Sequence, residues 1–421
     1  LEHKHVDKLV IDGGRPLNGT VEISGAKNAV LPIMALSLLS DGKSILHRVP
    51  DLRDTRTFIR LLNMLGAKSH FEDHSLTIDG SDITSFEAPY DLVKTMRASF
   101  YVMGPLLGRF GEARVSLPGG CAWGPRPVDY HLRGFEKLGA KITLKDGYIM
   151  AKAKKLKGAD INFEIASVGA TANIAMAAVL AEGTTRILNA AAEPHIVQLC
   201  ETLNSMGAEI EGIGSNNLII HGVNSLNNFE VSIISDMIEA GTFLMAGASL
   251  GDITIDKVDP SHLSIVLDKL NQAGCELSLT KDSITIKKCE NIKPVDMSTD
   301  VHPGFPTDLQ AQWIALMSIA NGASKVTDNI YHDRFAHVPE LNRLGAEITT
   351  DKNSAFVKGV NQLRGAQVMS TDIRASASLV IAGLIAKGRT DISRIYHIDR
   401  GYECIEEKFQ SLGAKIYREK E

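Results

Sequence analysis

Residues 138–144 read LGAKITL, a phrase that ends a helix and continues into an alternating, strand-like run. The phrase, or a near match to it, occurs six times in the 421-residue chain. Its glycines, spaced 67 to 73 residues apart, are Gly66, Gly139, Gly207, Gly274, Gly345 and Gly413. Such a regular spacing indicates an internal structural repeat. Because glycine readily takes the left-handed conformation that ends a helix, each phrase predicts a helix followed directly by a strand.

Each repeat also contains a second predicted helix, which is apolar on nearly all of its faces. Clear examples are the runs 28–42, 171–183, 310–322 and 376–388. A helix without a polar face is buried on every side. Since these runs also end at glycine before a strand, the repeat reads as a βαβα unit. The sequence therefore predicts an α/β fold of two domains, each with three repeats in pseudo-threefold packing around buried helices. The polar stretch 224–234 marks the change from the first domain, 27–232, to the second, 233–421.

Composition limits the possible functions. The apolar fraction of 44% and the charged fraction of 23% are typical of a globular protein in water. A net charge of −5 and only 5% aromatic residues disfavour a nucleic-acid partner. We expect no membrane insertion, because no apolar run approaches the roughly 20 residues of a span. Five cysteines without metal-site spacing favour a reducing, cytoplasmic location and no metal. The oligomeric state is left open.

The starts of the buried helices carry cations where a helix disfavours them. Lys27, Arg97 and Arg374 lie in or next to the first turn, at equivalent repeat positions. A cation there opposes the helix dipole, whereas an anion is stabilised. Helix N-termini together with Lys and Arg form phosphate sites. The three positions therefore predict a shared site for a multiply anionic substrate, held between the two domains.

One helix start also carries an acidic residue. Thr307 and Gln310 fit the T-x-x-Q capping-box pattern, in which each side chain caps the first turn. Asp308, between them, is then not needed for capping. We interpret Asp308 as a candidate functional carboxylate.

The stretch 118–131 reads PGGCAWGPRPVDYH. Its glycines and prolines exclude a regular helix or central strand, so we expect a shaped surface loop. The loop holds a thiol, Cys121, and a guanidinium, Arg126. A thiol near a cation on a glycine-rich loop is in a setting that favours reactivity.

These motifs resemble a known family. The runs 118–131, SGAKNAVLP from Ser24, SVGAT from Ser167, HPGFPTDLQAQ from His302 and HIDRGYECIE from His397 occur in the order found in the UDP-N-acetylglucosamine 1-carboxyvinyltransferase family. The resemblance covers nearly the whole chain. It implies an inside-out α/β barrel pair, with N-terminal strands at 1–26 that pack with the second domain. It implies transfer of an enolpyruvyl group from phosphoenolpyruvate to UDP-N-acetylglucosamine, as the first committed step of bacterial peptidoglycan synthesis, with no cofactor.

The resemblance also assigns roles to residues. Cys121 would be the proton donor, forming a covalent adduct with phosphoenolpyruvate and reacting with the family's epoxide inhibitor, fosfomycin. Asp308 would be the base. Lys27, Arg126 and Arg400 would contact phosphoenolpyruvate, with Arg374 beside them. The residues implied to hold the sugar nucleotide are Asn28, Arg97, Arg126, Pro127, Val128, Asp129, Tyr130, Ser167, Val168, Asp308 and Ile330. At Ile165, where some members have a lysine near the diphosphate, the chain departs from the pattern.

Two alternatives follow from the same sequence. The shikimate-pathway enolpyruvyl transferase shares the double-barrel fold, although the cysteine loop and the SVGAT run favour the sugar nucleotide. A catalytically silent paralogue that binds a sugar nucleotide belongs to another class. The presence of Cys121, Lys27, Asp308 and Arg400 argues against it.

We predict that Cys121→Ser abolishes or severely slows turnover, because the hydroxyl of serine is a much weaker acid than a thiol. Binding of UDP-N-acetylglucosamine should remain nearly intact. Phosphate release measures turnover, and titration calorimetry measures binding. Phosphate release at the unaltered rate would reject Cys121 as an essential residue.

Overall fold

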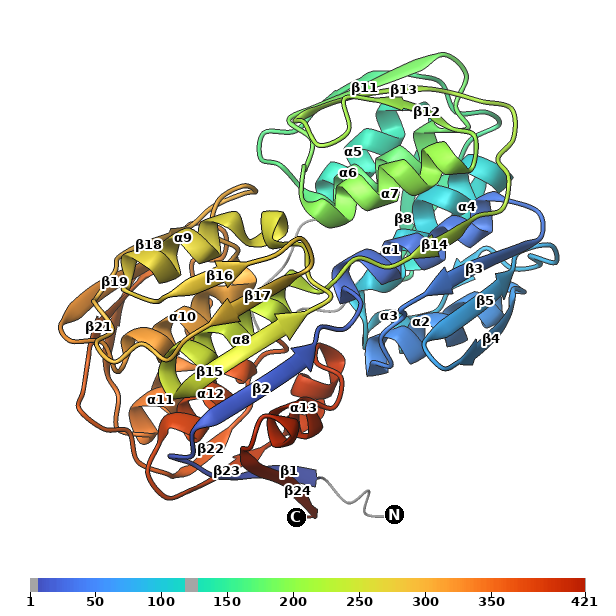
Figure 1. The fold of residues 1–421 in the computed structure, drawn as a ribbon. Helices are drawn as coiled ribbons and strands as arrows, with labels where there is room; N and C mark the ends of the chain where they lie inside the picture. Colours follow the sequence, from blue (N-terminus) through green and yellow to red (C-terminus); the bar gives the residue numbers. More distant parts are fainter. Residues whose placement is uncertain (1–6, 118–127, 421) are drawn as a thin grey trace. The chain divides into compact units, whose positions relative to one another are not determined.

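The computed structural model describes residues 7–117 and 128–420, and Figure 1 shows their fold. The chain divides into two compact units. We call residues 25–234 the N-terminal unit, and residues 7–24 together with 235–420 the C-terminal unit. Each unit has its own hydrophobic core. The chain passes from one unit to the other twice, after Ser24 and after Ile234.

The apolar helices predicted from the sequence are the centre of each core. Almost every residue in them is buried, the exceptions lying mainly at their ends. In the C-terminal unit α8, α10 and α12 pack against one another, and in the N-terminal unit α4 packs against α6. The buried helices of the described residues are α1 (Lys27–Leu36), α4 (Met103–Phe110), α6 (Val168–Ala178), α8 (Met237–Leu250), α10 (Gln310–Met317) and α12 (Ser376–Ile385).

The second helix of each repeat is amphipathic and ends as predicted. The glycine of every repeat phrase has a positive φ, between 90° and 111°. These helices are α2 (Arg53–Leu65), α5 (Asp129–Lys137), α7 (Pro194–Ser205), α9 (Ser264–Gln272), α11 (Val338–Arg343) and α13 (Ile405–Ser411). Shorter segments are α3 (Tyr90–Val93) and the 3-10 helices η1 (Ser37–Leu39), η2 (Arg97–Val102), η3 (Pro260–Leu263), η4 (Thr307–Leu309) and η5 (Ile395–Arg400).

The described strands form six sheets of four strands, three in each unit. In the N-terminal unit the orders are β14 (Glu230–Ser232)–β3 (Lys43–His47)–β5 (Ser75–Asp79)–β4 (Lys68–Glu72), β6 (Glu87–Ala88)–β7 (Glu112–Ser116)–β9 (Tyr148–Lys152)–β8 (Lys141–Lys145), and β10 (Asp160–Asn162)–β11 (Thr184–Leu188)–β13 (Asn217–His221)–β12 (Glu209–Glu211). In the C-terminal unit they are β16 (Leu277–Leu279)–β17 (Ser283–Ile286)–β15 (Gly251–Asp256)–β2 (Leu17–Glu22), β18 (Met297–Thr299)–β19 (Ala323–Asp328)–β21 (Ser354–Lys358)–β20 (Glu347–Asp351), and β22 (Gln367–Met369)–β23 (Arg389–Ser393)–β1 (Asp7–Asp12)–β24 (Lys415–Lys420).

In four of the six described sheets, the strands that precede and follow a buried helix pair in parallel. For example, β10 precedes α6 and pairs in parallel with β11, which follows it. The remaining strands pair antiparallel. Burial alternates along strands such as β11 and β19, so one face packs on the helices and the other faces solvent. Helices inside and sheets outside agree with the predicted α/β fold class, which is confirmed.

Three sheets are completed by strands from distant parts of the sequence. Strand β14 precedes α8 but pairs with β3, whereas β2 precedes α1 but pairs with β15. Strand β1 lies between β23 and β24, at the other end of the sequence. Figure 1 shows the blue strand β2 beside the yellow β15. The first strands therefore belong to the C-terminal unit. No described helix combines the length and the apolar character that a membrane span requires.

Some glycines that follow strands lie so close to the backbone just beyond a buried helix that no side chain would fit there. A Cβ at Gly359, which follows β21, would lie 1.7 Å from the carbonyl oxygen of Ala320, and one at Gly222 would lie 1.6 Å from that of Ala181. Gly388 differs, because it has a φ of +100° but open space around it.

We predict that Gly359→Ala lowers the free energy of unfolding by about 2–3 kcal/mol, the cost typical of forcing atoms into a well-packed core. Gly388→Ala is the matched control and should cost only about 1–2 kcal/mol, from left-handed backbone strain. Urea unfolding followed by circular dichroism measures both. No loss of stability in Gly359→Ala would show that the close approach to Ala320 contributes nothing.

Candidate active site

An aspartate stands at the start of each buried helix of the C-terminal unit. Asp236 is the N-cap of α8, Asp308 lies in η4 just before α10, and Asp372 precedes α12. Two buried arginines, Arg334 and Arg374, form ion pairs with them. We call these five residues the aspartate–arginine cluster.

Asp236 has two functions in this cluster. Its Oδ1 accepts hydrogen bonds from the backbone N–H groups of Ile238 and Glu239, at 2.9 and 3.1 Å, and so caps α8. Its Oδ2 accepts a 2.6 Å hydrogen bond from Arg374. The other Nη of Arg374 donates to the carbonyl oxygen of Gly401 at 2.6 Å. Arg374 thus ties the start of α8 to the residue that follows Arg400.

Arg334 connects the other two aspartates. Its Nη1 lies 2.7 Å from Oδ1 of Asp308, and its Nη2 lies 3.2 Å from Oδ1 of Asp372. Burial lowers the pKa of Arg334, but the two carboxylates outweigh burial and raise it above its usual range. Burial raises the pKa of Asp372, and Arg334 reverses this effect, so the pKa of Asp372 is lowered. Arg334 and Asp372 therefore both remain charged.

The predicted capping box at the start of α10 is wrong. The N-cap of η4 is Pro306, and no side chain caps it. The hydroxyl of Thr307 instead donates to Oδ2 of Asp328 at 2.7 Å, and the amide of Gln310 is buried without a partner among the described residues. Thr307 lies inside the 3-10 turn, so its hydroxyl points to β19 and not to the first-turn N–H groups. Asp308 is therefore not freed by a capping box, but is held by Arg334.

Two further predicted residues of this unit lie near the cluster in sequence. Ile330 follows β19, and its N–H donates to Oδ1 of Asp328 at 2.9 Å, which fixes the turn. Arg400 is the last residue of η5 and is half-buried. Beside it, Arg418 makes a bidentate pair with Asp399, at 3.0 and 2.6 Å. The C-terminal strand β24 therefore holds the segment that carries Arg400.

In the N-terminal unit, the start of α1 is cationic. Lys27 is the first residue of the helix, and its Nζ lies 2.9 Å from Oδ2 of Asp54, in α2. Both side chains are nearly buried, at 11% and 5% exposure. No side chain caps α1 in the described structure. Asn28 follows and is half-buried. The charge of Lys27 is thus partly balanced by a carboxylate of the protein itself.

Arg97, at the start of η2, lies near His131 of α5. The Nδ1 of His131 lies 3.1 Å from Nδ2 of Asn173, in α6, and the ring meets Phe100 edge-on. Because Nδ2 of an amide can only donate, His131 is neutral with its proton on Nε2. Burial, and then the charge of Arg97, lower the pKa of His131 to about 3. The starts of η2, α5 and α6 are therefore brought together around this ring.

Other predicted residues flank this group. Ser167 caps α6 by accepting from the N–H of Ala170 at 3.3 Å, and Val168 begins the helix. Val128 and Asp129 begin α5, where Asp129 pairs with Arg133 at 3.2 Å. The ring of Tyr130 packs on Phe163 with centroids 5.6 Å apart. Ile165 is exposed just before α6. Cys121, Arg126 and Pro127 lie outside the described residues.

Four residues of these two groups were not predicted from the sequence. Asp236 and Asp372 repeat the hydroxyl–aspartate pair of Thr307–Asp308, as Ser235–Asp236 and Thr371–Asp372, and that repetition could have revealed them. Arg334 and His131 have no comparable signal, because their partners are distant in sequence. Among the described residues, no three His, Cys, Asp or Glu side chains are grouped to hold a metal ion.

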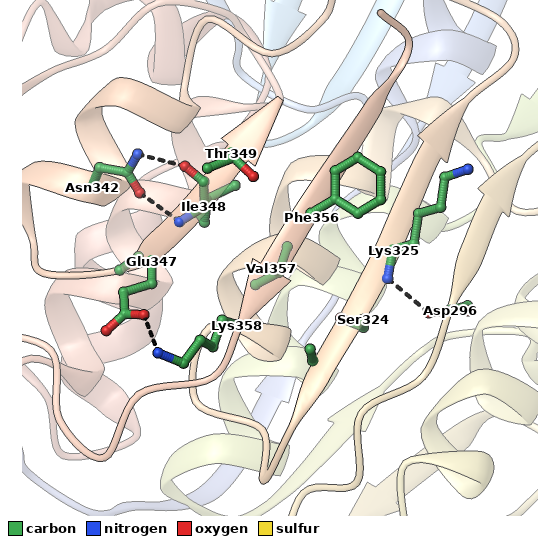
Figure 2. A pocket seen from close by; sticks show the side chains of 12 residues that line it. Asp296, Ser324, Lys325, Asn342, Glu347, Ile348, Thr349, Phe356, Val357 and Lys358 are labelled. Atoms are coloured by element: carbon green, nitrogen blue, oxygen red, sulfur yellow. Dashed lines mark hydrogen bonds and ion pairs between the residues drawn. The ribbon is translucent and has the colours of Figure 1, made fainter. Parts of the chain in front are cut away.

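A surface hollow lies elsewhere, over the sheet of β19–β21. It encloses about 790 Å³ and contains none of the predicted residues. Figure 2 shows Phe356 and Lys325 on neighbouring strands, with the Lys358–Glu347 ion pair at one side and Asn342 bonded to the backbone of Ile348. These groups are satisfied among themselves, so we assign the hollow no part in the active site.

The fold and the polar helix starts define a class of enzyme, the enolpyruvyl transferases. Residues 11–409 match the family model described as EPSP synthase (3-phosphoshikimate 1-carboxyvinyltransferase). The enolpyruvyl transferase NikO from Streptomyces tendae superposes with a TM-score of 0.91 at 26% identity, over 99% of this chain and 100% of NikO. EPSP synthase from Acinetobacter baumannii superposes with a TM-score of 0.76 at 17% identity, over 98% and 100%.

Closer relatives narrow the class. UDP-N-acetylglucosamine 1-carboxyvinyltransferase from Chloroherpeton thalassium is 57% identical over 418 residues, covering 98% of this chain and 97% of the relative. The enzyme of the same name from Chlorobium chlorochromatii is 57% identical over 419 residues, covering 99% of both chains. The chain belongs to the UDP-N-acetylglucosamine 1-carboxyvinyltransferase family, and the resemblance found in the sequence is confirmed.

We predict that His131 makes the stability of the protein depend on pH. Folding lowers the pKa of His131 from about 6.5 to about 3. Between these two pH values His131 is protonated in the unfolded chain but neutral in the folded chain. The free energy of unfolding should fall with decreasing pH across this window. In His131→Gln the fall should be shallower by up to about 1.4 kcal/mol per pH unit. Urea unfolding at several pH values measures this difference, and parallel curves for the two proteins would contradict it.

Proposed function

We propose that this chain transfers the enolpyruvyl group of phosphoenolpyruvate to the 3-hydroxyl of UDP-N-acetylglucosamine and releases phosphate. This reaction opens bacterial peptidoglycan synthesis. The observation that carries the proposal is 57% identity, over nearly the whole chain, to enzymes of that name. We place the reaction in the cytoplasm, which is supported by the free thiols of the four described cysteines.

The shikimate-pathway reaction is the alternative that one comparison favours by name. The matching family model is described by the shikimate enzyme. However, the chain is only 17% identical to a solved EPSP synthase. Similarity at this level indicates a shared fold but does not identify the substrate. The relatives at 57% identity therefore weigh more in the choice of acceptor.

The reaction is an addition followed by an elimination. The sugar oxygen bonds to the carbon that bears the phosphate, while a proton adds to the neighbouring methylene carbon. Loss of phosphate and of one proton then restores the double bond. The enzyme needs an acid for the carbon, a base for the hydroxyl and cations for the carboxylate and phosphates.

In this proposal the N-terminal unit supplies the acid and binds anions. Cys121 gives the proton to the carbon, and Arg126 follows it in the same loop sequence. The cation of Lys27, at the start of α1, favours phosphoenolpyruvate, and the uncapped start of the helix adds its dipole. Arg97 and the starts of α5 and α6 bind the sugar nucleotide. The residues of these two starts are Val128, Asp129, Tyr130, Ser167 and Val168.

The C-terminal unit supplies the base. Asp308 is half-buried and lies 2.7 Å from Arg334, and a carboxylate at this position would accept the hydroxyl proton. Arg400 binds phosphoenolpyruvate. Arg374 is only 3% exposed and paired with Asp236, so we propose that it supports the segment of Arg400 through Gly401.

We predict that the protein releases phosphate from phosphoenolpyruvate when UDP-N-acetylglucosamine is present, and not with shikimate 3-phosphate. Mass spectrometry should find the sugar nucleotide with one hydroxyl hydrogen replaced by an enolpyruvyl group. A colorimetric phosphate assay with each acceptor measures the choice. Phosphate release with shikimate 3-phosphate but not with UDP-N-acetylglucosamine as the acceptor would support the alternative enzyme. If neither acceptor leads to phosphate release but the sugar nucleotide still binds, the protein is a silent paralogue.

A further inference from the structure

Arg334 is buried in the interior, whereas its partner Asp308 is partly exposed to solvent. The side chain of Arg334 is 5% exposed, whereas that of Asp308 is 27% exposed. Arg334 is therefore more deeply buried than the carboxylate that it contacts. We propose that Arg334 is a positioning residue, which holds the Asp308 carboxylate in the orientation that accepts the proton of the sugar hydroxyl. This inference rests on the proposed function, in which Asp308 is the base.

The guanidinium group of Arg334 is itself held by a second carboxylate, that of Asp372. Its Nη2 donates to both oxygens of Asp372, at 3.2 and 3.4 Å. Asp372 is fixed in turn, because its Oδ1 accepts from the backbone N–H groups of Arg374 and Ala375 at 2.7 and 2.8 Å. The start of α12 thereby sets the plane of the guanidinium, and the plane sets where Nη1 meets Asp308.

A third anchor comes from the residue before Asp308. Nη1 of Arg334 also donates to the hydroxyl of Thr307 at 3.2 Å, and that hydroxyl donates to the buried Asp328. Asp328 further accepts from Thr299 and from the N–H of Ile330. Arg334 thus contacts both the side chain of Asp308 and the side chain that precedes it. The carboxylate is held through its own oxygen and through its neighbour in the chain.

This geometry requires arginine. One planar fork reaches two carboxylates and a hydroxyl at once, and a lysine ammonium is a single point charge on a flexible stem. Arg334→Lys keeps the positive charge and most of the volume, but it cannot keep all three contacts. The variant therefore separates positioning from charge.

The test measures steady-state turnover of Arg334→Lys in the full chain. We expect kcat to fall roughly 10- to 100-fold, as for loss of a hydrogen bond to a charged group. The KM for UDP-N-acetylglucosamine should stay within about threefold. Arg343→Lys, at an exposed arginine of α11, is the matched control and should leave both values unchanged. A kcat of Arg334→Lys within threefold of the unaltered enzyme would overturn the proposal.

A double-mutant comparison distinguishes positioning from a general structural role. If Arg334 acts through Asp308, Arg334→Lys should slow single turnover in the unaltered enzyme but add nothing in an Asp308→Asn background. A structural role would slow both backgrounds by the same factor, and that result would also overturn the proposal.

Thr307→Val is a second variant, for the case that Arg334→Lys does not fold. It removes only the hydroxyl between Arg334 and Asp328, and we expect a smaller loss of kcat that likewise disappears with Asp308→Asn. An unchanged kcat here would contradict the proposal. If the unaltered enzyme itself releases no phosphate, the proposed function fails. If that enzyme is active and the variants show no coupling to Asp308, only the positioning role fails.

Discussion

Three aspartates that share two buried arginines set the arrangement of the C-terminal unit. Asp236, Asp308 and Asp372 stand at the starts of three helices that pack against one another, and Arg334 and Arg374 join these starts. A buried ion pair adds little net stability over a well-packed apolar pair, but loss of one partner costs about 3–5 kcal/mol. The cluster therefore acts mainly by excluding other arrangements. A helix start that moved away would leave a buried charge without its partner.

The N-terminal unit also packs apolar helices together, but the charged residues at its helix starts are cations. Its helices are equally apolar, yet their starts carry Lys27, Arg97 and the hydroxyl of Ser167. Cations at helix starts are disfavoured by the dipole, so here the protein gives up some stability where an anion would restore it. Asp54 compensates Lys27 from the neighbouring helix. One repeat thus yields two chemically different ends, a carboxylate end suited to removing a proton and a cationic end suited to binding phosphate.

Much of this fold could be predicted because its causes are local. Left-handed glycines end the helices, and all-round apolar character buries them, and both are visible within a dozen residues. The exchange of β2 and β14 between the sheets could not be predicted from the local pattern, because each looks like any strand before a buried helix, and its partner lies about two hundred residues away. Only the family resemblance implied that the first strands pack with the second domain. The capping box failed for a similar reason. Thr307 fits the local pattern, but Asp328, 21 residues later, offers its hydroxyl a charged acceptor.

The candidate residues were found by type, but their ionic partners were not. Arg374 and Asp236 are 138 residues apart, and only the repeated fold brings them together. Those partners decide how each aspartate is held and how far it is exposed. Asp236 and Asp372 are each 6% exposed and use their oxygens for helix capping as well as ion pairs, whereas Asp308 is 27% exposed. A charge is stabilised least where water is excluded, and of the three carboxylates Asp308 is the one that water reaches. The same ion pairs that order the three helix starts therefore leave Asp308, the proposed base, at the surface of the cluster.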